Sequence, residues 1–234
     1  MEILPWQTAR KGRFTASSMY KLFTQPKTVK DREAGYLSET AKSYIEEVAI
    51  EELTGFRKEF SSAATDHGNQ YETEAFHWFS EATGLMFDFT GKTFYPIGQN
   101  SGASPDGVLY DAMEVISVAD VKCPFSPISF FEQKEMAMSC AGNKTQGVPP
   151  AYFYQLQTQM LATGAKSSFL VRYLSNNLNF SDGSSLAINL PLTARLFWTE
   201  VQADEEIQDQ IVQKIKQAEV YKQEVIQKFL TQIN

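Results

Sequence analysis

Apolar side chains recur along this chain with two different periods, and the change of period divides it into predicted helices and strands. A stripe with the 3.6-residue period of a helix runs through residues 38–53 and again through 66–83, and a glycine follows each stripe. From Leu85 onward the apolar residues come in short runs typical of strands. The predicted helices cover residues 15–23, 38–53, 66–83, 127–138, 150–163 and 204–230. The predicted strands cover residues 85–97 with a turn at Thr90-Gly91, then 101–110, 115–122, 168–174 and 185–190.

The order of these elements predicts the fold class. Helices come first, a cluster of strands follows, and helix and strand then alternate, which indicates an α+β (mixed α/β) fold with a central mixed sheet flanked by helices. The polar and basic segment 24–35, which contains Pro26, is predicted to be a surface loop. A length of 234 residues suits one domain spanning residues 1–234.

Composition excludes several classes of protein. No apolar run is long enough to span a bilayer, and the N-terminus lacks the regions of a signal peptide, so a cytoplasmic protein with no membrane partner is expected. The two cysteines, Cys123 and Cys140, are too few for a disulfide framework or a four-cysteine metal site. With only two histidines as well, any bound metal is expected to be a hard ion held by oxygen, such as Mg²⁺ or Mn²⁺.

Two carboxylates and a lysine on neighbouring predicted strands are the clearest candidates for chemistry. Asp106 lies in the Ser-Pro-Asp-Gly sequence of residues 104–107, and Asp120 precedes Val121 and Lys122. Strand alternation puts Asp120 and Lys122 on one face and the Val121 side chain on the other. Such a set can hold a divalent ion and offset the charge that develops during phosphodiester cleavage. A surface salt bridge beside a turn aspartate is the alternative that these residues alone leave open.

An upstream glutamate strengthens the interpretation as an active site. Glu72 is in register with Phe76 and Phe79 on the predicted helix 66–83, so it lies on or beside the buried stripe. A buried acid usually has a partner or a metal, whereas the alternative is a glutamate that complements the helix dipole. Gly107 is expected to permit a close approach of the backbone to a ligand.

Charge is unevenly distributed around a formal net charge of −7. Residues 1–32 contain seven basic residues and two acidic ones, whereas residues 66–140 contain eleven acidic residues and three lysines. A metal-dependent nuclease could hold phosphate with the first segment and cations with the second. Ordinary scatter of charge explains the same distribution equally well.

Further motifs lie before and after the carboxylate–lysine set. In chain order the motifs are Trp6-Gln7-Thr8-Ala9-Arg10, Phe14-Thr15-Ala16-Ser17, Glu72, Ser104-Pro105-Asp106-Gly107, Asp120-Val121-Lys122-Cys123-Pro124 and Gln155-Leu156-Gln157. This ordered set resembles the PD-(D/E)XK nucleases and, more narrowly, the phage lambda exonuclease family, also called the YqaJ-like viral recombinases. The resemblance runs from Trp6 to about Gln157, which is roughly two-thirds of the chain.

The resemblance implies a PD-(D/E)XK restriction-endonuclease-like core and a set of catalytic residues. Asp106 and Asp120 would bind one or two Mg²⁺ ions, for which Mn²⁺ can substitute, with the Val121 carbonyl completing the shell. Lys122 would position or activate the attacking water, and Glu72 would orient water or metal from its helix.

The resemblance also implies contacts to DNA. Arg10, Ser17 and Ser104 would bind the 5′-phosphate, although a solvated arginine is the alternative for Arg10. Gln155 would contact the reacting strand or the water, and Gln157 is a candidate for similar work. The Trp6 ring is the remaining candidate DNA contact. The sequence leaves two alternatives for this ring, stacking on a base or packing within the protein.

Two departures from the family pattern stand out. Asp120 occupies a position where members often have glutamate. The segment Ser61-Ser62-Ala63-Ala64-Thr65 has small residues where the lambda type has a bulkier apolar wedge that helps to separate the terminal base pairs.

The resemblance therefore predicts a Mg²⁺-dependent 5′-to-3′ exonuclease that acts on double-stranded DNA ends and leaves 3′ single-stranded tails for recombination. It implies a ring-shaped homotrimer, a single-strand annealing protein as partner, and a phage- or prophage-encoded protein in the cytoplasm of a bacterial host cell. The alternatives are a sequence- or structure-specific DNA endonuclease on the same core and a non-catalytic DNA-binding recombination scaffold.

Overall fold

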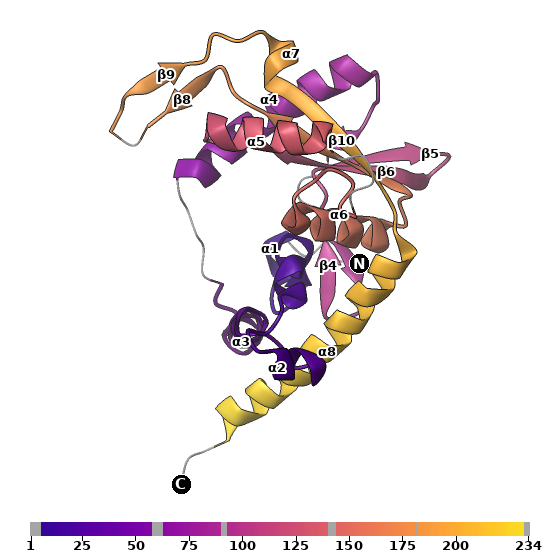
Figure 1. Ribbon diagram of the computed structural model, residues 1–234. Coiled ribbons are helices and arrows are strands. Elements are labelled where there is room, and N and C mark those ends of the chain that lie inside the picture. Colours follow the sequence, from indigo (N-terminus) through magenta and orange to yellow (C-terminus); the bar gives the residue numbers. More distant parts are fainter. Residues whose placement is uncertain (1–5, 58–62, 90–92, 140–143, 181, 232–234) are drawn as a thin grey trace.

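A five-stranded mixed sheet lies at the centre of the computed structural model, which describes residues 6–57, 63–89, 93–139, 144–180 and 182–231 (Figure 1). The strand order is β10-β7-β6-β5-β2, in which β6 and β7 are parallel and all other neighbours are antiparallel. This sheet confirms the predicted α+β class. The strands are Asp88–Phe89 (β2), Gly107–Asp111 (β5), Glu114–Lys122 (β6), Ser167–Tyr173 (β7) and Leu196–Gln202 (β10).

Alternate residues of β6 face two different helices. Val118 belongs to the cluster under α6 (Pro150–Thr163), whereas Ala119 and Val121 belong to the cluster under α4 (Ala63–Thr83). The sheet is therefore buried on both faces, and the even-numbered residues of β6 point towards α6. This alternation decides on which face of the sheet the side chains of Asp120 and Lys122 lie.

Gly107 has a packing role at the start of β5. A Cβ atom added there would overlap the ring of Phe76 on α4. The close approach that the sequence suggested at Gly107 is therefore made by this aromatic ring.

A small three-stranded sheet brings the N-terminal segment to the strands of the site. Its order is β1-β4-β3, with β1 and β4 parallel, and the bounds are Phe14–Thr15 (β1), Tyr95–Ile97 (β3) and Ser101–Ala103 (β4). Residues 101–110, predicted as one strand, are divided between the two sheets. The chain passes from β4 to β5 through residues 104–106, and the Asp106 amide donates to the Ala119 carbonyl at 3.0 Å. Pro105, which has no N–H to donate, lies in this crossing.

The helices η1 (Ala16–Phe23), α3 (Glu39–Thr54) and α8 (Glu205–Leu230) pack around Phe14, Tyr44 and Ile215. In Figure 1, α8 runs from the end of the large sheet past α3 to the C-terminus. The predicted end of α3 at a glycine is confirmed, since Gly55 ends the helix with a φ of 68°. At its start the Ser38 hydroxyl accepts from the Ala41 amide at 3.0 Å and caps the helix.

The remaining elements show where the sequence patterns were incomplete. The predicted loop 24–35 contains a one-turn helix, α2, so that prediction was partly wrong, and the predicted turn at Thr90-Gly91 is not covered because residue 90 and residue 91 lie outside the described residues. No helix in the described ranges is long and apolar enough to cross a membrane. The other elements are α1 (Trp6–Arg10), α2 (Val29–Glu33), α5 (Pro127–Met138), α7 (Leu192–Arg195) and the hairpin of β8 (Asn177–Asn179) and β9 (Ser185–Ala187).

Candidate active site

Asp120 is a buried carboxylate held from three directions. Its side chain is 2% exposed, and its Oδ2 atom forms an ion pair with Lys122, two residues further along β6. The Oδ1 atom accepts hydrogen bonds from Gln155 Nε2 at 2.6 Å and Gln159 Nε2 at 2.9 Å. Because all three partners lie on the α6 side of the sheet, the predicted parity of Asp120 and Lys122 is seen in the structure.

Asp106 lies against the same stretch of β6. Its Oδ2 atom accepts a hydrogen bond from the Val121 amide at 2.7 Å. Burial raises the pKa of Asp106 well above its ordinary value, and repulsion from Asp120 raises it further, while Lys122 and the Val121 amide oppose the shift. Two carboxylates this close repel each other, so the arrangement favours a cation between or beside them.

The pKa values of Lys122 and Glu72 are both shifted by charges of the same cluster. Burial alone would lower the pKa of Lys122, but the carboxylates of Asp120 and Asp106 outweigh it and raise the pKa, so this lysine is a stable cation. Burial and the charge of Asp120 raise the pKa of Glu72, whereas Lys122 lowers it. Glu72 on α4 is therefore electrostatically coupled to the pair on β6.

The carboxylates share one cavity with the predicted phosphate-binding residues. This active-site cavity has a volume of about 170 Å³. Asp106, Asp120 and Lys122 line it together with the serines and the arginine from the N-terminal and 104–107 motifs. The full lining is Trp6, Arg10, Thr15, Ala16, Ser17, Phe94, Gly102, Ser104, Asp106, Asp120, Lys122 and Gln155.

Contacts within the cavity orient its cationic side. The Trp6 indole N–H donates to the Ser104 hydroxyl at 2.9 Å, and the Arg10 guanidinium lies 4.3 Å from the centre of the Trp6 ring. Burial, with a smaller contribution from Arg57, lowers the pKa of Arg10 to about 10. Arg10 thus stays charged at neutral pH but is poorly solvated, which favours an anionic ligand beside it.

The oxygen donors fit a hard divalent cation. Asp106 and Asp120 supply carboxylate oxygens, and Glu72 adds negative charge nearby. Among the described residues, no three carboxylate, histidine or cysteine side chains are already gathered as a metal site. A cation on the Asp106–Asp120 pair would therefore need further oxygens, from water or from a backbone carbonyl such as that of Val121.

Three candidate residues, Glu72, Val121 and Gln157, are not among the residues that line the cavity, and one contributor to the site had not been predicted. Gln157 is 0% exposed; its Nε2 donates to the Gln202 carbonyl at 2.8 Å and its Oε1 accepts from the Asp204 amide at 2.9 Å. Its position in this structure does not support a DNA contact. Gln159 was missed, although its spacing of four residues from Gln155 places both amides on one face of α6.

Comparison with protein families identifies the class of this chain. Residues 5–166 match the family described as the YqaJ-like viral recombinase domain. The match covers more than half of the chain, and the chain therefore belongs to that family. A comparison with curated proteins found no match.

Solved structures share the fold across almost the whole chain. An alkaline exonuclease (LHK-Exo) from Laribacter hongkongensis is 23% identical, with 96% of this chain and 94% of that chain covered and a TM-score of 0.71. A phage-related exonuclease from Haemophilus somnus 129PT is also 23% identical, with coverages of 93% and 96% and a TM-score of 0.74. At these identities the likeness establishes the common fold.

Proposed function

We propose that this protein is a Mg²⁺-dependent 5′-to-3′ exonuclease that digests one strand of double-stranded DNA from its end. The observation that carries the proposal is the shared cavity, in which the carboxylates and Lys122 lie together with Arg10, Ser17 and Ser104. Membership of the recombinase family supports it, as does the fold shared with two proteins named as exonucleases.

The acidic side of the cavity is assigned to cleavage. Asp106 and Asp120 would hold one or two Mg²⁺ ions, or Mn²⁺ in their place, with the Val121 carbonyl as a further ligand. A divalent ion there supplies a more acidic water and offsets negative charge on the reacting phosphate. Lys122 donates to the phosphate or the water, and Glu72 orients that water from α4.

Gln155 and Gln159, which lie one turn apart on α6, both support the carboxylate of Asp120. Both Gln155 and Gln159 donate to the Oδ1 atom of Asp120, which leaves Oδ2 as the oxygen directed to Lys122. Fixing one oxygen in this way presents the other in a single orientation, as outer hydrogen bonds do at metal sites. Gln155 also lines the active-site cavity, so it can touch the reacting strand.

The cationic side of the cavity is assigned to the DNA end. Arg10, Ser17 and Ser104 would bind a terminal 5′-phosphate, because a guanidinium and two hydroxyls are suitable donors to its oxygens. A phosphate bound there places the strand terminus in the same cavity as the carboxylates. This arrangement favours cleavage from an end over cleavage within a closed duplex.

We further propose the biological setting that this activity requires. Removal of one strand leaves a 3′ single-stranded tail, which a single-strand annealing protein would bind and pair during recombination. Three copies closed into a ring around DNA would make digestion processive, because the enzyme could not dissociate without unthreading. The protein would be phage- or prophage-encoded and act in the cytoplasm of a bacterial host cell.

The test is a time course on linear duplex DNA labelled separately at each 5′ and each 3′ end, with and without Mg²⁺. The expected result is early release of the 5′ label, only with Mg²⁺, and no attack on covalently closed circular DNA. Asp106→Ala should abolish release, whereas Asp111→Ala, an exposed aspartate at the end of β5, should not. Nicking of the closed circle would instead indicate an endonuclease, and early release of the 3′ label would overturn the polarity.

The phosphate assignment has its own test. Wild-type protein should digest 5′-phosphorylated ends faster than 5′-hydroxyl ends, and Arg10→Gln should remove this preference. Arg32→Gln, at an exposed position on α2, is the matched control. Equal rates on the two ends for the wild type would refute the 5′-phosphate site while leaving the nuclease assignment intact.

A further inference from the structure

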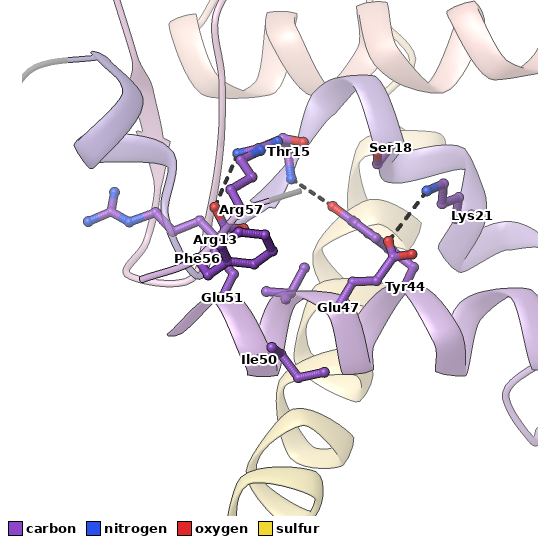
Figure 2. Close-up of a pocket in the computed structure, with 11 residues that line it drawn as sticks. Arg13, Thr15, Ser18, Lys21, Tyr44, Glu47, Ile50, Glu51, Phe56 and Arg57 are labelled. Atoms are coloured by element: carbon purple, nitrogen blue, oxygen red, sulfur yellow. Dashed lines mark hydrogen bonds and ion pairs between the residues drawn. The ribbon is translucent and has the colours of Figure 1, made fainter. Parts of the chain in front are cut away.

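A second cavity, of about 310 Å³, adjoins the active-site cavity, since Thr15 lines both. We call it the η1–α3 cavity, after the two helices that form most of its walls. Its volume is at the lower end of the range for small-ligand sites, which is about 300–1,000 Å³. Figure 2 shows the lining, which is Arg13, Thr15, Ser18, Lys21, Tyr44, Glu47, Val48, Ile50, Glu51, Phe56 and Arg57.

Cations outnumber acids in the η1–α3 cavity, and two of the cations are available to a ligand. Arg57 lies 3.5 Å from Glu51, whose side chain is only 8% exposed, so this pair is partly buried. Lys21 lies 3.9 Å from Glu47, which is 66% exposed, and such a pair is weak. Arg13 forms no ion pair within the part of the chain that the structure describes. Arg13 and Lys21 can therefore each receive an anion, but they lie at opposite ends of the lining, and Lys21 is the one beside Ser18 (Figure 2).

Apolar side chains form another part of the lining of the η1–α3 cavity. Val48 and Ile50 come from α3, and Phe56 follows the glycine that ends this helix. The Phe56 side chain is 69% exposed although it belongs to the cavity lining. In Figure 2, Phe56 lies at the Arg57–Glu51 end of the lining, and Lys21 lies at the other end. An exposed ring on a cavity wall is a surface on which a nucleic-acid base can stack.

We propose that the η1–α3 cavity is a nucleotide subsite that takes one nucleotide of an unpaired DNA strand next to the active site. Lys21 and the Ser18 hydroxyl bind its phosphate at one end of the lining, and its base stacks on Phe56 at the other end. The phosphate and the base of a nucleotide are separated in the same way. The choice of DNA as occupant rests on the proposed function, since Thr15 places the two cavities side by side.

The test measures binding without cleavage, with the full-length protein in EDTA. A fluorescein-labelled twelve-residue oligothymidylate is titrated by anisotropy, and dAMP is titrated by calorimetry. Phe56→Ala and Lys21→Gln should each weaken oligothymidylate binding about tenfold, a fold-change equal to about 1.4 kcal/mol and within the range for one stacked base. Phe229→Ala and Lys216→Gln, on exposed positions of α8, should change it less than about twofold.

Melting curves show whether each variant is folded. If Lys21→Gln is not folded, Phe56→Ala decides the outcome. Oligothymidylate affinities equal to those of the controls, or no binding by the wild type, would overturn the proposal. Loss of dAMP binding with unchanged oligothymidylate binding would assign the cavity to a free nucleotide and also overturn it. The same preparations are assayed for end cleavage with Mg²⁺, so failure of the nuclease assignment is seen separately.

Discussion

Lys122→Met removes the cation that pairs with Asp120 while keeping an unbranched side chain of similar length. Asp120 is 2% exposed and Lys122 is 28% exposed, so the carboxylate left behind lies deeper than the ammonium that is lost. Loss of one partner from a buried ion pair costs about 3–5 kcal/mol. Water reaches Lys122, and Gln155 and Gln159 still donate to Asp120. We therefore expect a smaller loss, of about 2–3 kcal/mol in the free energy of unfolding.

The assay is unfolding by heat and by urea at neutral pH in EDTA. For a chain of this size about 1 kcal/mol changes the Tm by about 2–4 °C, so the Tm should fall by about 4–12 °C. Lys216→Met, on an exposed position of α8, is the matched control. The double variant Lys122→Met with Asp120→Asn should recover most of the loss, because the neutral amide oxygen still accepts from the glutamines and no buried charge remains.

Mg²⁺ extends this experiment to the proposed metal site. In Lys122→Met the Oδ2 atom of Asp120 is free of its ion pair, so Mg²⁺ should stabilise this variant more than it stabilises the wild type. The reasoning about the pair is refuted if Lys122→Met is as stable as Lys216→Met in EDTA, or if Asp120→Asn restores nothing. An equal effect of Mg²⁺ on the variant and the wild type would count against Asp120 as a ligand.

Three further predictions follow from the same geometry. The raised pKa of Asp106 means that its stabilising contribution is present below its ordinary value of 3.8 and is lost as the pH rises towards the folded value. In EDTA, Asp106→Asn should therefore gain stability relative to wild type from about pH 4 upward in urea unfolding. Gln159→Leu removes a donor to the buried Asp120 and should cost about 1–3 kcal/mol and slow end cleavage in a turnover assay. Gly107→Ala should cost about 1–3 kcal/mol by overlap with the aromatic ring packed there, whereas Gly68→Ala, with open space around it, should not destabilise the protein in the same melting experiment.

Elements whose burial follows a regular period were predictable from the sequence, and those formed by distant pairing were not. The helices α5 and α6 were predicted with the bounds that the structure shows. The strand β10 was missed because three consecutive apolar residues at its start, Leu196 to Trp198, hide the alternation that pairing with β7 produces. The helix α2 was missed because it is one exposed turn capped by Thr28, with no apolar stripe to detect.

The candidate site was predictable where it depends on a local rule. Strand parity placed Asp120 and Lys122 on one face, and the buried stripe of the predicted helix pointed to Glu72. The proximity of Arg10 to these carboxylates depends on the parallel pairing of β1 with β4, which joins segments about ninety residues apart in sequence. No pattern within either segment predicts that pairing, so the suggestion that the basic and acidic segments meet came from the resemblance and from the uneven charge.

Helical geometry explains why the two glutamines of the Gln-X-Gln motif do different work. Successive residues of an α-helix are turned by about 100°, so Gln155 and Gln157 point in nearly opposite directions, whereas Gln155 and Gln159 share a face. Gln155 accordingly reaches Asp120, while Gln157 bonds to the Gln202 carbonyl and the Asp204 amide, where β10 leads into α8. The motif therefore holds the Asp120 carboxylate on one side of α6 and the start of the long C-terminal helix on the other. Replacing Gln157 is accordingly a test of how α8 is anchored, and replacing Gln155 is a test of the active site.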